Sequence, residues 1–385
     1  MADHTSLISY LRSPWQVDNK TRESLISDCQ AVIESLETPI EVARKDAFVT
    51  LDLAVIRTAI QLDIFALLSR GARSYATQDI AAATLPPCDA AILSRLLRHL
   101  ANPLHLVKEA GRNLWSLTKR GRVYTDPSFK ATCTLFFDTM SSAYLTLPQW
   151  ICTEPTKRAP TSFQVGHPDE EGYFQWIQKD ESKLQAFHTV MEMLKGQYTS
   201  QDYVDMDKWI PDDISENDVA FVDIGGSIGV QCLALKEKRG SRPGRIINQD
   251  RLEVIQKAKE SLVNKGVEAM AYDFFTEQPI KGAHIYYLRT VFHDWGDDDC
   301  IRILERIKEA MASSSTLLID EIVLPEQGSH WMVTQHDLTM LAMFNSGERS
   351  EAQWRALLTR ANLWVEGIHR YDENMAASII VARLK

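Results

Sequence analysis

The sequence has no long apolar run, and this excludes a membrane-spanning helix. No stretch of about 18 consecutive apolar residues occurs anywhere in the chain. The first twenty residues include Asp3, Arg12, Asp18 and Lys20, so they have no apolar core of signal-peptide length. We therefore expect a cytoplasmic protein without a membrane partner.

Glycine, proline and cysteine are also scarce. Seventeen glycines and fourteen prolines among 385 residues are too few for a low-complexity or collagen-like chain. No CxxC pair, HExxH motif or Cys/His cluster occurs, so reduced packing thiols are expected and no metal site is predicted. The six cysteines are Cys29, Cys88, Cys133, Cys152, Cys232 and Cys300.

Positive charge is in deficit, which bears on the partners that the chain can have. The net charge of -10 argues against nucleic acid as the main partner. The share of hydrophobic residues, 45%, is that of an ordinary globular protein, and the length suggests two or three domains. We divide the chain into residues 1–135, residues 136–215 and residues 216–385.

Residues 41–135 show helical periodicity. An apolar run over 43–68 has near-helical spacing, a short helix follows with Thr77 as its N-cap, and a helix rich in Leu and Ile covers 90–100. A turn at 109–113 then joins two short apolar runs. This is the pattern of a winged helix-turn-helix.

Two interpretations of the winged helix stay open at this point. DNA binding would use the basic side chains of its second helix and of the wing tip. A structural or dimerisation module agrees better with the acidic balance of the chain. The basic residues concerned are Arg95, Arg98, His99 and Arg112.

From residue 216 short β-rich runs alternate with helical segments, such as 252–265 and 298–312. This alternation predicts an α/β fold with a doubly wound, mostly parallel sheet of seven strands. The last two strands are joined by the short turn 372–374, so we expect them to pair antiparallel. The expected strands are 220–224, 245–249, 267–272, 284–288, 316–323, 364–371 and 378–382.

The strongest motif, at 221–229, opens this domain. A strand ends in a turn that contains Gly225, Gly226 and Gly229, where the backbone can approach a ligand. The dinucleotide fingerprint GxGxxG fails, because Ser227 and Val230 stand where it needs glycine. A ligand without a pyrophosphate therefore fits better, although a plain strand-to-helix turn is the alternative.

Two acids follow the next two strands. Asp250 can accept hydrogen bonds from both hydroxyls of a ribose, and the alternative is a helix N-cap. Asp273, followed by Phe274, suits an adenine through one hydrogen bond and one stacking face. A turn aspartate beside a core phenylalanine is the alternative there.

Taken together, these motifs resemble those of the class I S-adenosylmethionine-dependent O-methyltransferases of the caffeic-acid type, especially their fungal secondary-metabolism branch. The resemblance covers roughly residues 45–385. It implies that the N-terminal winged helix dimerises and does not read DNA. The motifs that carry it are 222–229, 249–251, 272–275, 287–295, 320–325 and 347–351.

The resemblance also implies a cofactor site in a Rossmann-like C-terminal domain. Gly225, Gly226 and Gly229 would approach the methionine part of S-adenosylmethionine, and the product would be S-adenosylhomocysteine. Asp250 and the adjacent Arg251 would lie at the ribose. Asp273 and Phe274 would hold the adenine, and Arg289 would lie near the sulfonium.

His293 is the expected catalytic base. It lies just beyond the fourth strand, and an ordinary pKa near 6.5 suits proton removal at neutral pH. By the resemblance, Glu321 and Glu348 orient this imidazole, and we include the adjacent Asp294 in the catalytic group. The alternatives are a core or capping histidine, a strand-end acid at Glu321 and a surface acid paired with Arg349 at Glu348.

The resemblance also implies a substrate pocket, near which this sequence departs from the plant pattern. Arg289 stands where plant members often have lysine, Gly226-Ser227 replaces a third glycine, and 343–347 is shorter than in plant members. Core packing is therefore an equal alternative for the pocket residues. These residues are Phe187, Met191, Met340, Met343 and Phe344.

Three functions follow from these patterns. The first is methylation of a hydroxyl on an aromatic or polyketide-like small molecule by a homodimer. The second is a pericyclase that binds S-adenosylmethionine without consuming it; the intact His293, Glu321 and Glu348 favour the first. The third is a winged-helix DNA-binding regulator, which a steep salt dependence on heparin would support.

Overall fold

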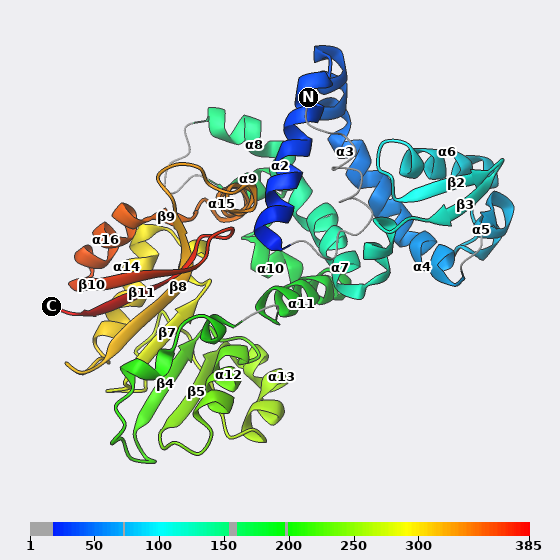
Figure 1. Ribbon diagram of the computed structural model, residues 1–385. Coiled ribbons are helices and arrows are strands. Elements are labelled where there is room, and N and C mark those ends of the chain that lie inside the picture. Colours follow the sequence, from blue (N-terminus) through cyan, green and yellow to red (C-terminus); the bar gives the residue numbers. More distant parts are fainter. Residues whose placement is uncertain (1–17, 72–73, 154–159, 197–198) are drawn as a thin grey trace. The chain divides into compact units, whose positions relative to one another are not determined.

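The computed structural model describes residues 18–71, 74–153, 160–196 and 199–385 (Figure 1). The chain forms two compact units, which divide between Arg122 and Val123. The division precedes the boundary expected after residue 135, because the helix α7 (Pro127–Leu135) packs on α11 (Glu181–Gly196) of the second unit. No helix in these described ranges is long and apolar enough to cross a membrane.

The first unit combines helices with a small sheet, in the arrangement expected of a winged helix. Its three strands are antiparallel in the order β1-β3-β2. The helices are α2 (Asn19–Leu36), α3 (Pro39–Gln61), α4 (Ile64–Ser69), α5 (Thr77–Ala83) and α6 (Ala90–Ala101), and the strands are β1 (Tyr75–Ala76), β2 (Val107–Gly111) and β3 (Leu114–Leu117).

The expected helical run over 43–68 is confirmed, and it is divided between α3 and α4 where Asp63 adopts a left-handed conformation with φ of 52°. One local expectation for this unit was wrong. Thr77 does not cap α5, whose N-cap is Ala76. Its hydroxyl instead accepts a hydrogen bond of 2.9 Å from the indole of Trp115, a fully buried side chain that needs an acceptor.

The second unit begins with short helices that surround an aromatic cluster. These are α7, α8 (Ser141–Cys152), α9 (Ser162–Gly166), α10 (Tyr173–Ile177) and α11. A later helix, α15 (Trp331–Phe344), packs against α8 and α9, so residues far apart in sequence share one apolar core here.

The large sheet follows the predicted pattern, with seven strands in the order β10-β11-β8-β7-β4-β5-β6. Strands β4 to β8 pair in parallel, whereas β11 pairs antiparallel with both β8 and β10, as the short turn between the last two strands predicted. A short strand, β9 (Arg349–Ser350), adds to β8. The strands are β4 (Val219–Ile224), β5 (Arg245–Asp250), β6 (Glu268–Ala271), β7 (Ile285–Arg289), β8 (Thr316–Leu324), β10 (Leu363–Asp372) and β11 (Ala377–Leu384).

Helices cover both faces of this sheet (Figure 1). Successive strand residues point to opposite faces, so Val222 packs with α14 (Asp297–Lys308) and α16 (Glu351–Arg360). Its neighbour Phe221 packs with α12 (Val230–Arg239) and α13 (Leu252–Val263) on the other face. Burial on both faces explains why the central strands are almost wholly apolar.

The sheet topology fixes where a ligand can bind. β4 lies between β5 and β7, so the connections that leave β4 and β7 run to opposite sides of the sheet. Open α/β sheets bind ligands at such a switch point, outside the carboxyl ends of the strands. The glycine turn follows β4, and Arg289 ends β7, so both lie at this edge.

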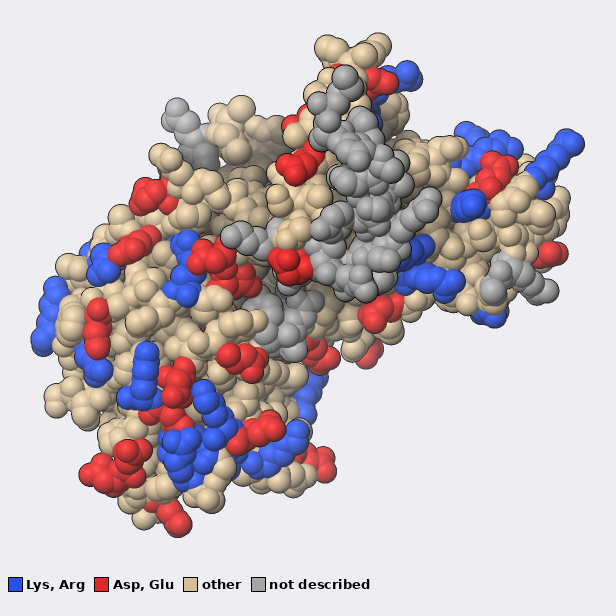
Figure 2. Space-filling model, viewed as in Figure 1, with Lys and Arg blue, Asp and Glu red and all other residues tan. Residues whose placement is uncertain are grey.

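The charged side chains do not separate by sign on the face shown in Figure 2. Lysine and arginine side chains are interspersed with aspartate and glutamate there. This distribution offers no support for a nucleic-acid surface on that face.

Candidate active site

The turn after β4 requires its three glycines for steric reasons. Gly225 and Gly229 have φ of +76° and +81°, a backbone conformation that L side chains rarely adopt. A Cβ atom on Gly226 would lie 2.1 Å from Oδ1 of Asn248. The turn therefore presents bare backbone at the edge of the sheet.

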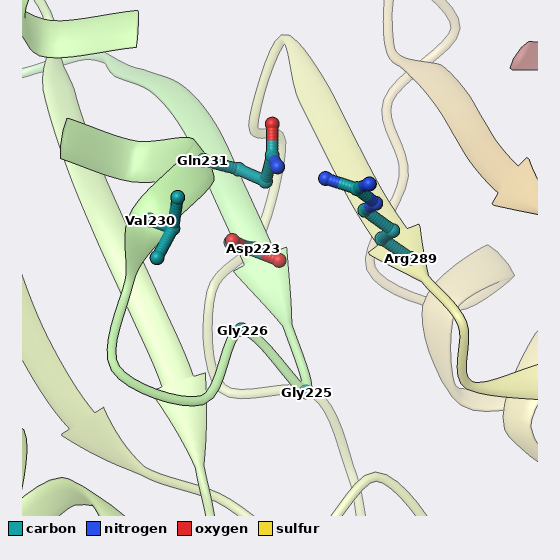
Figure 3. Close-up of a pocket in the computed structure, with 6 residues that line it drawn as sticks. All are labelled: Asp223, Gly225, Gly226, Val230, Gln231 and Arg289. Carbon is teal, nitrogen blue, oxygen red and sulfur yellow. The ribbon is translucent and has the colours of Figure 1, made fainter. Parts of the chain in front are cut away.

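A pocket opens above this turn (Figure 3). Gln231, from the start of α12, extends toward Arg289 at the end of β7, and Asp223 lies below them. Nε2 of Gln231 is buried and has no hydrogen-bond partner among the described residues. The pocket is lined by Asp223, Gly225, Gly226, Val230, Gln231 and Arg289.

Arg289 is held from below by a buried acid. Its Nε lies 3.6 Å from Oδ2 of Asp320, which is fully buried and also accepts hydrogen bonds from the hydroxyls of Tyr287 and Tyr371. Burial raises the pKa of Asp320, although Arg289 acts in the opposite direction. A guanidinium, an unsatisfied amide donor and a carboxylate in one pocket fit the charged amino-acid end of S-adenosylmethionine.

Asp250 faces the glycine turn. Its carboxylate accepts hydrogen bonds from the backbone N–H of Ser227 at 2.8 Å and of Arg251 at 2.7 Å. The structure does not support the N-cap alternative, because the cap position of α13 is Arg251 and no side chain bonds there. Arg251 itself is exposed and pairs with Glu253 at 3.5 Å.

Asp273 and Phe274 follow β6 in a short turn. Asp273 is exposed, and its carboxylate accepts the backbone N–H of Phe275 at 3.0 Å. Phe274 is half-buried with its ring edge-on to Trp295, at 5.9 Å between ring centroids. Both features match the alternative of a turn aspartate beside a core phenylalanine. The pair nevertheless lies at the carboxyl edge of the sheet, where a ligand can bind.

His293 lies in a 3₁₀ turn, Phe292–Asp294, shortly after β7. Oε1 of Glu321, on the neighbouring strand β8, accepts the backbone N–H groups of Val291 and Phe292, both at 2.8 Å. Glu321 thus fixes the turn that carries the histidine. Its other oxygen lies 3.8 Å from Nδ1 of His293.

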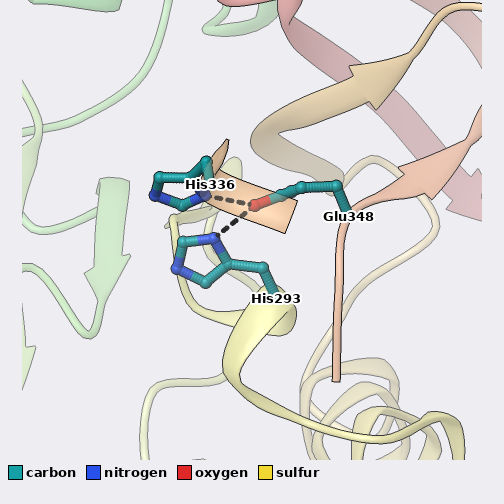
Figure 4. Close-up of side chains that lie close together, drawn as sticks. All are labelled: His293, His336 and Glu348. Atoms are coloured by element: carbon teal, nitrogen blue, oxygen red, sulfur yellow. Dashed lines mark hydrogen bonds and ion pairs between the residues drawn. The ribbon is translucent and has the colours of Figure 1, made fainter. Parts of the chain in front are cut away.

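Glu348 accepts the direct hydrogen bond from the imidazole. Oε1 of Glu348 lies 3.0 Å from Nδ1 of His293 (Figure 4). Nε2 of His293 lies 3.7 Å from Oδ1 of Asp294. The same Oε1 lies 2.7 Å from Nδ1 of His336, whose ring stacks on that of His293. The structure thus brings together all four expected catalytic residues and adds His336.

The buried charges of this group change its proton affinities. Burial alone lowers the pKa of His293, but Glu321, Asp294 and Glu348 outweigh it and raise the pKa to about 10. Burial raises the pKa of Glu348, but its hydrogen bonds to the two histidines outweigh burial and lower the pKa to about 2. For Glu321 burial dominates and raises the pKa to about 7. The pKa of His293 thus lies above the ordinary histidine value near 6.5.

Glu348 is not the surface acid that was the alternative at this position. Only 6% of it is exposed, and its backbone N–H donates to Asp337 at 2.8 Å. Arg349 turns away to Asp297 at 3.0 Å and to the backbone oxygens of Phe292 and Trp295. Arg349 thereby ties the strand β9 to the turn that carries His293.

His293, His336 and Glu348 present donor atoms that lie within 4.8 Å of one another, a spacing that can also suit a metal ion. Both Nδ1 atoms already share the carboxylate oxygen of Glu348. Because that carboxylate is ionised and can only accept, each Nδ1 must carry a proton. We therefore interpret the group as a hydrogen-bonded cluster.

The expected pocket residues lie in or beside the aromatic cluster of the second unit. Phe344 stacks on Phe174 with centroids 5.3 Å apart, and Phe187 meets Phe174 edge-on at 6.2 Å. Met191 is partly buried in this cluster, whereas Met343 and Met340 are buried. Core packing thus accounts for the two buried methionines, and the half-buried rings keep an accessible surface.

Two residues at the site were missed from the sequence. His336 lies in the largely apolar helix α15, and Gln231 follows the glycine turn as an ordinary helix residue. No spacing signal in the sequence links either of them to the site. Only the folded chain places His336 beside Glu348.

Comparisons with known proteins agree with this geometry. Residues 166–363 match the family model of the O-methyltransferase domain, and residues 47–127 match that of the O-methyltransferase dimerisation domain. The chain is 50% identical over 332 residues to O-methyltransferase apf6 of Gibberella fujikuroi, an alignment that covers 86% of this chain and 95% of that protein.

Solved structures are similar over nearly the whole chain. A structure of LepI in complex with SAM superposes with a TM-score of 0.87 at 27% identity, and covers 99% of this chain and 98% of LepI. A structure described as a pericyclic reaction enzyme superposes with a TM-score of 0.86 at 26% identity, and covers 99% of this chain and 100% of that one. The chain belongs to the S-adenosylmethionine-dependent O-methyltransferases of the fungal secondary-metabolism group, with a dimerisation domain ahead of the catalytic domain.

Proposed function

We propose that this protein methylates a hydroxyl group of an aromatic or polyketide-like secondary metabolite, with His293 as the general base. The observation that carries the proposal is the buried His293–Glu348 pair beside Glu321, at the sheet edge that also holds the glycine turn and Arg289. An imidazole oriented by a carboxylate is the arrangement that proton removal from a hydroxyl requires.

S-adenosylmethionine, when bound, supplies an electrophilic methyl group and leaves as S-adenosylhomocysteine. Arg289 and Gln231, with the backbone of Gly225, Gly226 and Gly229, would hold its methionine part. Asp250 and Arg251 would hold the ribose, and Asp273 and Phe274 the adenine. The orphaned amide of Gln231 supports the methionine site, and the carboxylate of Asp250 beside the glycine turn supports the ribose site. The adenine site rests on the family resemblance.

The protein's own part in the reaction is to align the substrate and to take its proton. Nε2 of His293 accepts the hydroxyl proton while the substrate oxygen forms its bond to the methyl carbon. Glu348 and Glu321 compensate the charge of the resulting imidazolium. The aromatic rings of Phe174, Phe187 and Phe344 would pack against a flat substrate.

The raised pKa of His293 sets the pH range in which the rate should change, and the role of the imidazole sets the direction. With a pKa of about 10, the imidazole is protonated at neutral pH in the protein without substrate. A base must be neutral to act, so methylation should accelerate as the pH rises toward about 10, and not level off near the ordinary histidine value.

The same protonated histidine favours a second candidate function. An imidazolium beside the substrate could donate a hydrogen bond in a pericyclic reaction, with S-adenosylmethionine bound but not consumed. Similarity to a pericyclic reaction enzyme supports this alternative. Here the activity should fall as the pH rises through about 10, because the cation is lost.

One experiment separates the two functions. The protein is incubated with methyl-labelled S-adenosylmethionine and a panel of phenols and enols, and S-adenosylhomocysteine is measured against product. Stoichiometric release is expected, and turnover without release would overturn methylation. His293→Ala should lose about 10²–10⁴-fold in turnover and leave cofactor affinity nearly unchanged in calorimetry.

We further propose that the protein acts as a homodimer built through its N-terminal unit. Helices α2 and α3 expose a set of large apolar side chains that water disfavours. These are Ile26, Val32, Ile33, Leu36, Ile40, Val42, Phe48, Val49 and Leu51. The cytoplasmic location expected from the sequence stays a prediction.

A further inference from the structure

The two carboxylate oxygens of Glu348 differ in their hydrogen bonding. Oε1 lies within hydrogen-bond distance of both His293, at 3.0 Å, and His336, at 2.7 Å. Oε2 is buried and has no hydrogen-bond partner among the described residues. The two imidazoles therefore share one acceptor atom, and the shorter bond goes to His336.

The two histidines differ in their access to water. The side chain of His336 is 31% exposed, whereas that of His293 is 9% exposed. Their rings stack with centroids 5.2 Å apart and an interplanar angle of 28°. His336 thus lies between the buried acid–base pair and the solvent side of α15.

We infer that His336 is a positioning residue of this site, which controls through the shared Oε1 of Glu348 how strongly that carboxylate holds the proton on His293. An oxygen that accepts one N–H bond binds a second one less strongly, because its negative charge is divided between them. The N–H of His336 therefore weakens the grip of Glu348 on His293 and favours the neutral imidazole. This role deepens the proposed function and rests on it only for the activity measurements below.

Asp294 and Glu321 act on His293 directly, whereas Glu348 also bonds to His336. Asp294 lies on the same turn, Glu321 approaches from β8, and Glu348 comes from the segment before β9. Asp337, next to His336 on α15, accepts the backbone N–H of Glu348 and so holds this segment in place. None of these contacts needs the ring of His336, so its N–H can be removed alone.

Two variants isolate the shared hydrogen bond. His336→Phe keeps an aromatic ring for stacking and removes the donor. His336→Asn removes the ring and keeps an amide N–H near the position of Nδ1. If the shared bond matters, the phenylalanine variant should show the effect and the asparagine variant should reverse most of it.

The rate of methyl transfer as a function of pH is the first measurement. In His336→Phe the rising limb should move to higher pH, which lowers the rate at neutral pH about three- to tenfold. The rate at the alkaline plateau should change little. An equal loss at every pH, or a limb that moves to lower pH, would overturn the inference and indicate a purely structural role.

Titration of His293 by NMR, in protein labelled at histidine, is the second measurement and needs no catalytic activity. The titration midpoint of His293 should rise in His336→Phe and return toward the wild-type value in His336→Asn. An unchanged midpoint in His336→Phe refutes the inference even if methylation is confirmed. A shifted midpoint in a protein that releases no S-adenosylhomocysteine supports the inference and refutes the proposed function.

Discussion

For single residues, the contacts made in the fold decide whether an acidic side chain has a local structural role or belongs to the site. Asp250 could have capped α13, but its carboxylate turns to the backbone of the glycine turn. Glu348 could have paired with Arg349 on the surface, but it is buried between two imidazoles. In both positions a neighbour distant in sequence provides the partner.

Asp250 should contribute to the affinity for the cofactor. Asp250→Ala should weaken binding of S-adenosylhomocysteine by about 1–3 kcal/mol, because the ribose hydroxyls lose a charged acceptor. Calorimetry at fixed pH measures this, and Asp250→Asn should fall between the two, since it keeps an oxygen for the N–H of Ser227. Glu260→Ala, which removes an exposed acid of α13, is the control and should bind as the wild type does. Unchanged affinity in Asp250→Ala would remove Asp250 from the site.

At the scale of elements, helix ends set where the catalytic segments begin. The helix α15 carries His336 and ends at Asn345, which adopts a left-handed conformation with φ of 52°. This reversal lets the chain turn back so that Glu348 reaches His293 three residues later. A C-terminal residue in this conformation is usually glycine or asparagine, because other side chains are strained there.

The left-handed conformation of Asn345 should affect the stability of the protein. Asn345→Ala should lower the free energy of unfolding by about 1 kcal/mol, because alanine is strained in the left-handed region. Asn345→Gly should be close to neutral or stabilising, since glycine adopts this conformation without strain. Urea denaturation of both variants measures the difference. Equal stabilities of the two variants would show that the helix ends in another way in solution.

At the scale of the whole molecule, the two units carry different surfaces. The large sheet buries apolar residues on both faces, whereas α2 and α3 leave large apolar side chains exposed. Residues 47–127 match a dimerisation domain, so a second copy of the chain is the expected cover for these helices. An interface above about 2,000 Å² is expected for such an obligate homodimer.

A charge placed on the exposed apolar face of α3 should weaken the dimer. Val49→Asp should shift the protein toward monomer in light scattering at micromolar concentration, because a carboxylate would be buried in an apolar interface. Val263→Asp is the matched control, since Val263 is 54% exposed on α13 and Val49 is 60% exposed on α3. A wild-type monomer at this concentration, or equal effects of the two variants, would contradict the assignment of the interface.

The alternation of strands and helices, the antiparallel pair at the end and the glycine turn after β4 were all predictable from the sequence. These features depend on side-chain period and on local backbone sterics, which neighbouring residues encode. The role of Thr77 could not be predicted, because the indole that takes its hydroxyl as acceptor, Trp115, is distant in sequence.

The chemistry of the cluster around His293 could not be predicted from the sequence, because its members meet only in the folded chain. Glu348 is 55 residues from His293 in sequence, and His336 reaches the same carboxylate oxygen from another element. The pKa of His293 depends on burial and on the charges of Glu321 on β8, of Asp294 on its own turn and of Glu348 before β9. Such long-range electrostatics leave no periodic trace in the sequence, and so the sequence suggested an ordinary histidine where the fold makes a strongly basic one.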